Sequence, residues 1–365
     1  MTTGPLDGVI VADFTRVLAG PYCTMLLGDM GAEVIKVERP GAGDDTRAWG
    51  PPYAPSGQST YFASVNRNKK AVGIDLGTPG GVQAARDLIA GADIVIENFK
   101  VGTLERLGLD YASVSTDHPA LIYCTISGFG SGAGRELPGY DLLVQAMGGL
   151  MSVTGPGPGE PTKVGVALVD VITGLHATVG ILAALHHRDA TGQGQRIEVN
   201  LLSSLLSALV NQSSAYAGAG VVPGILGNAH PSIAPYEVYA TADRPLIIAV
   251  GNDRQFASLA QALGAPGLAD DVRYRTNPDR VANREDLKQE LLALLALASA
   301  DEWQERLTRA GVPCGPINDI AQAFALAERL GLAPIVDAGG TPTVAHPIGF
   351  GRTPATYRLP PPASP

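Results

Sequence analysis

The sequence predicts an α/β protein whose larger domain contains a parallel sheet. Short β-branched runs alternate with segments whose apolar residues recur at helical spacing, the pattern of strands joined by helical crossovers. The strand candidates are residues 9–12, 34–37, 94–96 and 121–123, and the helix candidates are residues 19–30 and 80–90. Because strand, helix and strand follow in succession, we expect an open sheet of parallel strands.

A further apolar run at residues 164–169 leads directly to Asp170 and then to a helical pattern. We interpret the run as a strand, so the sequence predicts that Asp170 lies at a strand-to-helix junction. Residues 195–199 are interpreted as one more strand and residues 200–216 as a long helix. Glycine and proline between residues 218 and 224 end this pattern and mark the end of the large domain.

The later part of the chain has a different pattern. Residues 236–240 and 246–250 read as two strands of a hairpin. Three helical stretches follow, at residues 254–263, 284–297 and 301–310. This part is therefore predicted to form a smaller α+β domain, and the proline-rich tail from residue 354 is predicted to be non-helical.

Composition excludes several classes of function. The formal charge is −9 in 365 residues, so nucleic acid and anionic membrane surfaces are not expected partners, and an anionic ligand must be held by local basic residues. No uninterrupted apolar run of about 18 residues is present, and the N-terminus lacks a basic segment followed by an apolar one. The three widely spaced cysteines fit reduced thiols, and no metal-ligand spacing is found. We expect a cytoplasmic protein without a metal.

Taken singly, the candidate functional residues are ordinary. An aspartate at a helix start, such as Asp170, is usually a cap because its oxygen accepts hydrogen bonds from free backbone N–H groups. Lys69, Lys70, Arg39 and Arg106 are typical of a solvated surface. Only the order of the motifs along the chain points to a specific function.

That order strongly resembles the family III CoA transferases and extends over nearly the whole chain. Single blocks could arise by chance, but this many in sequence are highly specific. The blocks are residues 5–21, 31–40, 43–47, 66–70, 96–99, 138–141, 169–170, 192–195, 227–231, 233–237 and 311–316.

The resemblance implies a particular architecture. It implies a large Rossmann-like domain made from both ends of the chain, residues 1–200 with 321–365, a linker at residues 201–225 and a small domain at residues 226–320. It also implies a homodimer of two chains threaded through each other as interlocked rings. The active site would then lie between the large domain of one subunit and the small domain of the other.

The resemblance places the catalytic carboxylate at Asp170, with Tyr140 and Asp141 beside the thioester. It implies transfer of CoA from an acyl-CoA to a carboxylic acid through a mixed anhydride and an aspartyl-CoA thioester. The CoA thioester is a co-substrate, and no permanently bound cofactor is expected. Because a helix N-terminus favours an anion, we expect Asp170 to remain ionised at neutral pH.

Further residues are carried over from the family motifs as CoA contacts and as a lid. Basic side chains would bind the phosphates, and residues at the strand ends would contact the rest of CoA. The expected contacts are Leu18, Ala19, Arg39, Lys69, Lys70, Asn98, Phe99 and Arg106, and the expected lid residues are Gly227, Asn228 and His230.

Two departures bear on the substrate. The formyl-CoA transferases have a glutamine where this chain has Leu18, and a polyglycine loop where it has residues 227–231. The block at residues 43–52 resembles instead the dicarboxylate members that use succinyl-CoA. We therefore expect succinyl-CoA or a similar short acyl-CoA as the donor.

Two other functions remain open on the sequence. An α-methylacyl-CoA racemase shares the fold, but racemases have a histidine where this chain has Tyr140, and tyrosine is a poor base at neutral pH. Asp253 is the one carboxylate near the position of the other racemase partner. A noncatalytic CoA-binding protein is the second alternative, and the retention of Asp170 with the basic residues argues against it.

Overall fold

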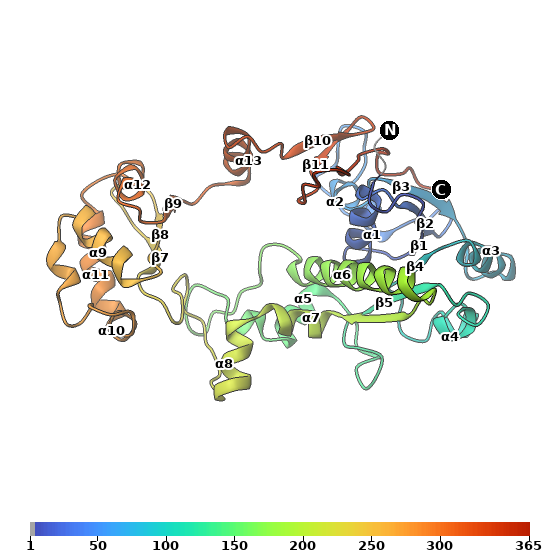
Figure 1. Cartoon of the computed structure of the whole chain (residues 1–365), viewed down its shortest axis with the longest axis horizontal. Coiled ribbons are helices and arrows are strands. Elements are labelled where there is room, and N and C mark those ends of the chain that lie inside the picture. The colour runs from blue at the N-terminus through green and yellow to red at the C-terminus, as the bar shows by residue number, and fades with distance from the viewer. Residues whose placement is uncertain (1–3) are drawn as a thin grey trace. The chain divides into compact units, whose positions relative to one another are not determined.

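The computed structural model describes residues 4–365, which fold as two compact units (Figure 1). The first unit contains the described residues up to Met151, Lys163–Val222 and Ala333–Pro365. The second contains Ser152–Thr162 and Pro223–Leu332. The first unit is therefore assembled from chain segments on both sides of the second.

The first unit is built on a six-stranded parallel sheet with the order β3-β2-β1-β4-β5-β6. This order is that of a doubly wound α/β sheet, and it reverses direction between β1 and β4. The predicted parallel sheet is confirmed, although β3, which begins with two lysines, was missed. The strands are β1 (Ile10–Phe14), β2 (Glu33–Glu38), β3 (Lys69–Gly73), β4 (Ile94–Glu97), β5 (Ile122–Ser127) and β6 (Arg196–Asn200).

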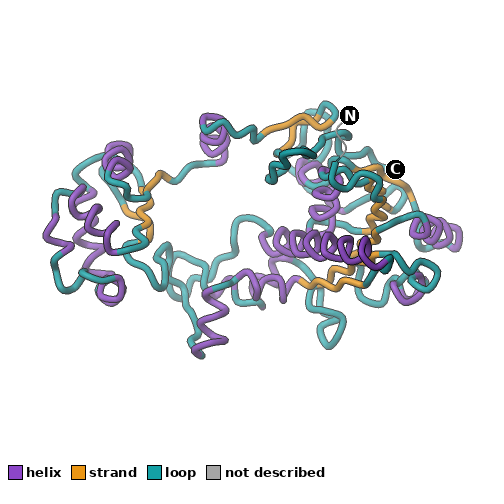
Figure 2. Tube along the Cα trace, viewed as in Figure 1, coloured by secondary structure: helices purple, strands orange, loops and turns teal. Residues whose placement is uncertain are grey.

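Helices cover both faces of this sheet (Figure 2). α1 (Ala19–Asp29) and α6 (Leu168–Thr191) bury their apolar residues in one core, and α3 (Pro79–Ala90) and α4 (Tyr111–Val114) in the other. Among the described residues, α6 is the one helix long and apolar enough to cross a membrane. Its buried residues pack in the core against α1, whereas Leu175 and Val179 on the same helix are exposed.

Two sequence predictions are wrong in this unit. Residues 164–167 form no strand, because Val164 donates its backbone N–H to the Gln145 side chain at 2.9 Å rather than to a neighbouring strand. The predicted long helix is two helices, α7 (Leu201–Ala208) and α8 (Asn211–Ala219). They are separated at Val210, whose φ of 42° is incompatible with a continuous right-handed helix.

The C-terminal segment closes the first unit at the β3 edge. After the hairpin of β10 (Ile335–Ala338) and β11 (Thr341–Val344), the chain returns without a helix, as predicted. The Asn68 N–H, just before β3, donates to the Leu359 carbonyl at 3.0 Å. The Thr356 N–H donates to the Asp29 carbonyl at the end of α1 at 2.9 Å. The last residues thus join the C-terminal end of α1 to the start of the edge strand.

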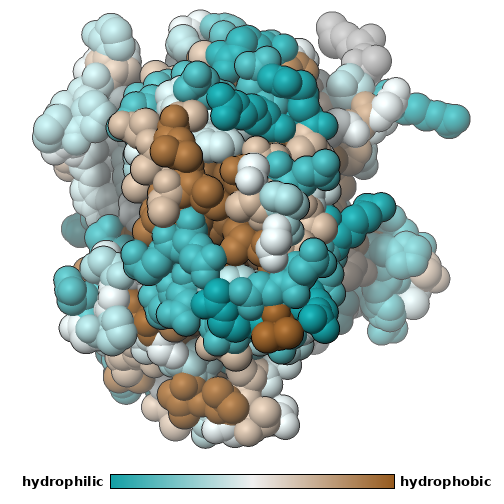
Figure 3. Space-filling view, turned by 90° about the vertical axis from the view of Figure 1, so that its left-hand side faces the viewer, coloured by the Kyte–Doolittle hydropathy of each residue, from teal (hydrophilic) through white to brown (hydrophobic). Residues whose placement is uncertain are grey.

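The second unit is a small α+β fold. β7 (Tyr236–Tyr239) and β8 (Leu246–Ala249) pair antiparallel, so the predicted hairpin is confirmed, and β9 (Cys314–Pro316) adds a third strand. One core is formed by the apolar residues of three of its helices, at residues 253–262, 284–295 and 300–309. Figure 3 shows one face of the molecule, on which hydrophobic side chains are exposed between hydrophilic ones. The helices are α9 (Asp253–Ala262), α10 (Asn277–Ala282), α11 (Arg284–Leu295), α12 (Ala300–Arg309) and α13 (Ile320–Arg329).

Candidate active site

A cavity of about 530 Å³ opens at the carboxyl ends of β1, β4 and β5. Its walls are residues 16–19 after β1, 98–101 after β4 and 127–130 after β5, together with residues 134–141 and Asp170. The cavity therefore lies where the strand order reverses, between β1 and β4. Doubly wound sheets bind their ligands at this position.

Asp170 is the third residue of α6, and its side chain lines the cavity while being only 9% exposed. Within residues 4–365, no group donates a hydrogen bond to its carboxylate. Burial, and secondarily the charge of Asp141, raise the pKa of Asp170 to about 7. The prediction that the helix N-terminus keeps Asp170 ionised is thus corrected: at neutral pH the two protonation states are about equally populated.

Asp141 adds to the effect of burial on the pKa of Asp170 and also takes the place of a cap at the start of α6. It is the first residue of α5 (Asp141–Met147), and its Oδ1 accepts hydrogen bonds from the backbone N–H groups of Val169 at 2.9 Å and Asp170 at 3.2 Å. Its Oδ2 accepts from Gln145 Nε2 at 2.6 Å. The free N–H groups at the start of α6 are therefore used by Asp141, and the cap is Asp141 rather than Asp170.

Three other predicted residues line the same cavity. Tyr140 precedes α5 and is 65% exposed, whereas Leu18 and Ala19 are buried at the start of α1. In the part of the chain that the structure describes, no side chain caps the N-terminus of α1. The structure thus places Tyr140, Asp141, Leu18 and Ala19 along the same cavity as Asp170.

Lys69 is placed differently from the prediction. Its side chain is fully buried, and its Nζ donates to Asp13 Oδ2 at 3.2 Å, the Pro21 carbonyl at 2.9 Å and Asn66 Oδ1 at 2.9 Å. All three ammonium protons therefore have internal acceptors. Burial lowers the pKa of Lys69 to about 8 although the charge of Asp13 opposes the change. Lys69 is a structural cation of the sheet, so the prediction of a phosphate contact is corrected.

The remaining basic candidates are exposed. Lys70 on β3 forms an ion pair with Glu33, the first residue of β2, at 2.5 Å. Arg39 directly follows β2, at the carboxyl edge of the sheet. Arg106 lies in a short 3₁₀ helix, Glu105–Leu107, with its guanidinium near Gly102. Arg39 and Arg106 are thus free to meet an anion, and Lys70 is paired at the opposite, amino-terminal end of its strand pair.

Asn98 and Phe99 do line the cavity, but the Asn98 amide is engaged within the protein. Its Oδ1 accepts from the Arg16 backbone N–H at 2.9 Å, and its Nδ2 donates to the Arg16 carbonyl at 2.7 Å. The Arg16 guanidinium lies 5.6 Å from the centre of the Phe99 ring. Asn98 therefore fixes the turn after β1, and Phe99 supplies an apolar wall.

Several cavity residues were missed from the sequence. Lys100 and Arg135 lie at the cavity and share the exposed carboxylate of Glu136, at 2.7 Å and 3.7 Å. The Arg135 guanidinium also approaches Gly102, next to that of Arg106. No local pattern distinguishes such exposed charges from other surface residues. Their position after β4 and in the 134–141 loop was the available signal.

Tyr61 in α2 (Thr60–Ser64) was also missed from the sequence. Burial, and then the charges of Asp170, Asp141 and Asp44, raise the pKa of Tyr61 to about 12. The Tyr61 ring also packs edge-on against Trp49, with 5.2 Å between the ring centres. The phenol is therefore neutral and lies within electrostatic range of Asp170.

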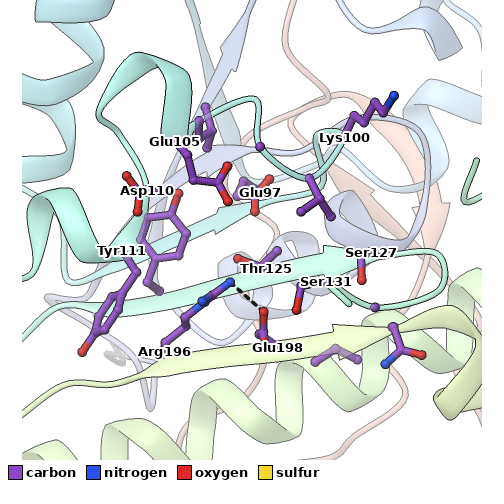
Figure 4. Close-up of a pocket in the computed structure, with 17 residues that line it drawn as sticks. Glu97, Lys100, Glu105, Asp110, Tyr111, Thr125, Ser127, Ser131, Arg196 and Glu198 are labelled. Atoms are coloured by element: carbon purple, nitrogen blue, oxygen red, sulfur yellow. Dashed lines mark hydrogen bonds and ion pairs between the residues drawn. The ribbon is translucent and has the colours of Figure 1, made fainter. Parts of the chain in front are cut away.

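A smaller polar cavity of about 220 Å³ adjoins the first and shares Lys100 and Ser127 with it (Figure 4). Four carboxylates line it, and Glu198 is paired with Arg196 at 2.6 Å. Burial raises the pKa of Glu97 to about 7. The other carboxylates are Glu105 and Asp110. A second acidic group near the main cavity therefore titrates close to neutrality.

The predicted lid residues and Asp253 belong to the second unit. Gly227 has a φ of 60°, and the loop ends at His230, whose backbone N–H donates to the Tyr236 carbonyl at 3.1 Å. Arg284 donates to the His230 carbonyl at 3.1 Å. The Asp253 carboxylate accepts from the buried Arg280 at 2.8 Å. Asp253 is therefore already engaged in an ion pair.

Comparison with known proteins identifies the family. The sequence model described as CoA-transferase family III matches residues 6–364. The chain is 45% identical to the succinate–glutarate CoA-transferase of Agrobacterium fabrum, over 98% of this chain and 92% of that protein. It is 46% identical to the succinyl-CoA:glutarate CoA-transferase of Mus musculus, over 89% and 75%.

A solved structure agrees with this result. The crystal structure of a CaiB/BaiF family protein from Brucella suis matches with a TM-score of 0.88 and 42% identity, covering 99% of this chain and 96% of that one. Both the sequence and the fold are therefore shared over nearly the full length. The chain belongs to CoA-transferase family III and is an enzyme that transfers CoA between an acyl-CoA and a carboxylic acid.

Proposed function

We propose that this enzyme transfers CoA from succinyl-CoA or a similar short acyl-CoA to a dicarboxylic acid, with Asp170 as the nucleophile. One observation carries the proposal. The Asp170 carboxylate is nine-tenths buried, receives no hydrogen bond within residues 4–365 and opens into the cavity at the strand-order reversal. A carboxylate without hydrogen-bond donors is poorly stabilised, and therefore reactive once it is ionised.

In the first half of the reaction, an Asp170 oxygen attacks the thioester carbon and the C–S bond breaks. The products are a mixed anhydride and CoA thiolate. The thiolate then attacks the aspartyl carbonyl carbon, and the donor acid leaves as a carboxylate. An aspartyl-CoA thioester remains on the protein.

The second half reverses these steps with the acceptor. Its carboxylate attacks the aspartyl thioester, which gives a second anhydride and free thiolate. The thiolate attacks the acceptor carbonyl, so that the new acyl-CoA forms and Asp170 is regenerated. Water must be excluded because both intermediates hydrolyse readily. The loop with Gly227, Asn228 and His230 is the proposed lid.

The CoA ester is held by local cations, since the protein as a whole carries a charge of −9. Arg39 and Arg106 are the proposed phosphate ligands because both are exposed and neither guanidinium has a carboxylate partner within 4.0 Å among residues 4–365. CoA is a co-substrate in this scheme, and no resident cofactor takes part.

The choice of acids rests on two supports. The relatives from Agrobacterium fabrum and Mus musculus are named for succinate or succinyl-CoA and glutarate. In this chain, Lys100 and Arg135 lie at the cavity, where a second carboxylate of a dicarboxylic acid would meet a cation.

The three cysteines are free thiols, which supports a cytoplasmic location.

The active enzyme is proposed to be an interlocked homodimer. Large apolar side chains are exposed along consecutive helices, including Leu175 and Val179 on α6 and Leu206 on α7. A second copy of the chain would cover these residues and supply the lid. Light scattering at decreasing concentration tests this proposal, and active monomers would contradict it.

Isotope exchange tests the function. Wild-type enzyme incubated with succinyl-CoA and labelled succinate is expected to exchange label into the thioester. Without an acceptor, hydroxylamine is expected to trap an adduct at Asp170, detected by peptide mass spectrometry. Exchange of the α-hydrogen of a methyl-branched acyl-CoA without acid exchange would indicate a racemase. Binding of CoA without either exchange would indicate a noncatalytic protein.

A further inference from the structure

The turn between β1 and α1, residues 15–17, has an unfavourable backbone conformation. Val17 has a φ of 70°, in the left-handed region that a β-branched residue rarely adopts. Such a conformation costs about 1–3 kcal/mol and persists only when its surroundings impose it. The turn leads directly into Leu18 and Ala19, which line the cavity with Asp170.

Four side chains impose this conformation: one on β1, one on β2, one in the loop after β2 and one directly after β4. Asp13 Oδ1 accepts from the Thr15 N–H at 2.9 Å, and Asn98 binds both the N–H and the carbonyl of Arg16. Lys36 Nζ donates to the Thr15 carbonyl at 2.9 Å. Asp44 Oδ1 accepts from the Val17 N–H at 3.4 Å. Five successive backbone polar groups are thus bound by side chains instead of by a regular element.

Lys36 and Asp44 are the buried centre of this arrangement. Lys36 Nζ lies 2.9 Å from Asp44 Oδ2, and both side chains are 0% exposed. The pair therefore joins the carbonyl at the start of the turn to the N–H at its end. A buried ion pair gives little net stability compared with apolar residues of the same volume. Its distinctive contribution here is the geometry of the turn.

The turn determines where α1 begins. The first residue of α1, Ala19, lines the same cavity as the proposed nucleophile Asp170. Among the described residues, no side chain caps the first turn of α1, so its backbone N–H groups carry the positive end of the helix dipole towards the cavity. Gly174, one turn after Asp170 on α6, lies against Ala19, because a Cβ on Gly174 would be 2.5 Å from the Ala19 carbonyl oxygen. The unpartnered Asp170 carboxylate and the uncapped start of α1 therefore belong to one cavity.

We infer that Lys36 and Asp44 are positioning residues, whose buried ion pair holds the 15–17 turn so that the N-terminus of α1 faces the carbonyl group attacked during transfer. This inference rests on the proposed function of Asp170. Each attack creates a negative oxygen on a tetrahedral carbon, and fixed N–H donors stabilise that charge in the transition state more than in the substrate. The pair acts through the turn and touches neither substrate nor the reacting atoms.

The test is the double variant Lys36→Met with Asp44→Asn, which removes the ion pair without leaving one charge buried. A displaced oxyanion donor is expected to lower kcat by about 30-fold or more. The KM for acyl-CoA is expected to stay within about threefold, because the phosphate ligands are elsewhere. The single variant Asp44→Asn disturbs the turn less, and its kcat is expected to fall about 5-fold. It replaces the double variant in the test if the double variant does not fold.

The matched control is Arg67→Met with Asp29→Asn, which removes another buried ion pair, at the opposite end of α1, with 2.6 Å between Arg67 Nη2 and Asp29 Oδ2. This control is expected to lower the unfolding midpoint while kcat stays within about threefold. A folded double variant, or Asp44→Asn, with kcat within twofold of wild type would overturn the inference. Absence of exchange and adduct in the wild type, measured alongside, would instead overturn the proposed role of Asp170.

Discussion

The carboxylate of Asp141 caps the helix that carries Asp170, so the two acidic side chains share one helix N-terminus. A helix N-terminus stabilises only as much negative charge as its free N–H groups can bind. Asp141 uses those groups and adds its own charge, and Asp170 is left buried without a hydrogen bond. Asp170, the proposed nucleophile, is therefore a destabilised carboxylate, and this property can be measured.

The pH dependence of transfer is expected to report the Asp170 ionisation. Because only the carboxylate attacks and its pKa is raised to about 7, kcat/KM is expected to fall about tenfold per pH unit below 7 and to level off above it. The control is Glu97→Gln, since burial also raises the pKa of Glu97 to about 7. Glu97→Gln is expected to keep the profile. A profile that follows Glu97 instead would refute the assignment.

Asp141→Asn is expected to move that profile to lower pH. The amide oxygen can still accept the N–H groups of Val169 and Asp170, but the negative charge that raises the pKa of Asp170 is removed. The pH–rate profile of the variant, measured beside wild type, checks this. An unchanged midpoint in a folded variant would show that burial alone sets the pKa.

Asp170→Asn is expected to abolish transfer and to stabilise the fold at neutral pH. The amide cannot form the anhydride, so no hydroxylamine-trapped adduct is expected. The folded-state pKa of Asp170 lies above the ordinary aspartate value of 3.8, which holds in the unfolded chain. Folding thus takes up a proton between about pH 4 and 7, and wild-type stability falls as pH rises through that window. The cost is roughly 4 kcal/mol above pH 7.

Denaturant unfolding of both proteins across pH 4 to 8 measures this difference. The stability advantage of Asp170→Asn is expected to be small near pH 4, to grow as pH rises and to level off above 7. An advantage that is the same at every pH would mean that ionisation is not its cause. Substantial transfer by the folded variant would end the nucleophile proposal.

Lys69→Ala is expected to lower the stability of the fold, whereas Arg106→Ala is expected to weaken the binding of acyl-CoA. Lys69→Ala leaves the buried Asp13 carboxylate without its cation, so the free energy of unfolding is expected to fall by about 3–5 kcal/mol. Arg106 is exposed, so Arg106→Ala is expected to keep the unfolding midpoint and to raise the KM for acyl-CoA. Thermal unfolding and initial rates, measured on both variants, test these two expectations. A stable Lys69→Ala with weakened CoA binding would restore Lys69 as a phosphate ligand.

The parallel sheet could be predicted from the sequence because the spacing of apolar residues and the runs of β-branched residues are local signals, as in β1, β2 and β4. Prediction failed at residues 164–169: residues 164–167 are an irregular connection whose first N–H is bound by Gln145, and residues 168 and 169 already belong to α6. It also failed at Val210, because a left-handed valine has no signature in composition. The connection at residues 164–167 depends on a contact with Gln145, which lies 19 residues earlier in the chain.

The site was predicted in the same uneven way. Motif order indicated Asp170, Tyr140 and Asp141, and the structure places all three at one cavity. The ionisation of Asp170 was mispredicted because the capping role of Asp141 depends on α5 meeting α6. Lys69 was mispredicted for a related reason: adjacent lysines alternate across a strand, so one is buried with Asp13 and the other is exposed.

The C-terminal segment that joins α1 to the β3 edge also orders the biosynthesis of the protein. Asn68 and the end of α1 receive their partners, Leu359 and Thr356, only after about 290 and about 330 further residues, respectively, have left the ribosome. The second unit, by contrast, is complete at Leu332. The inserted unit can therefore fold while its host is still open, and the unit that contains Asp170 is closed last.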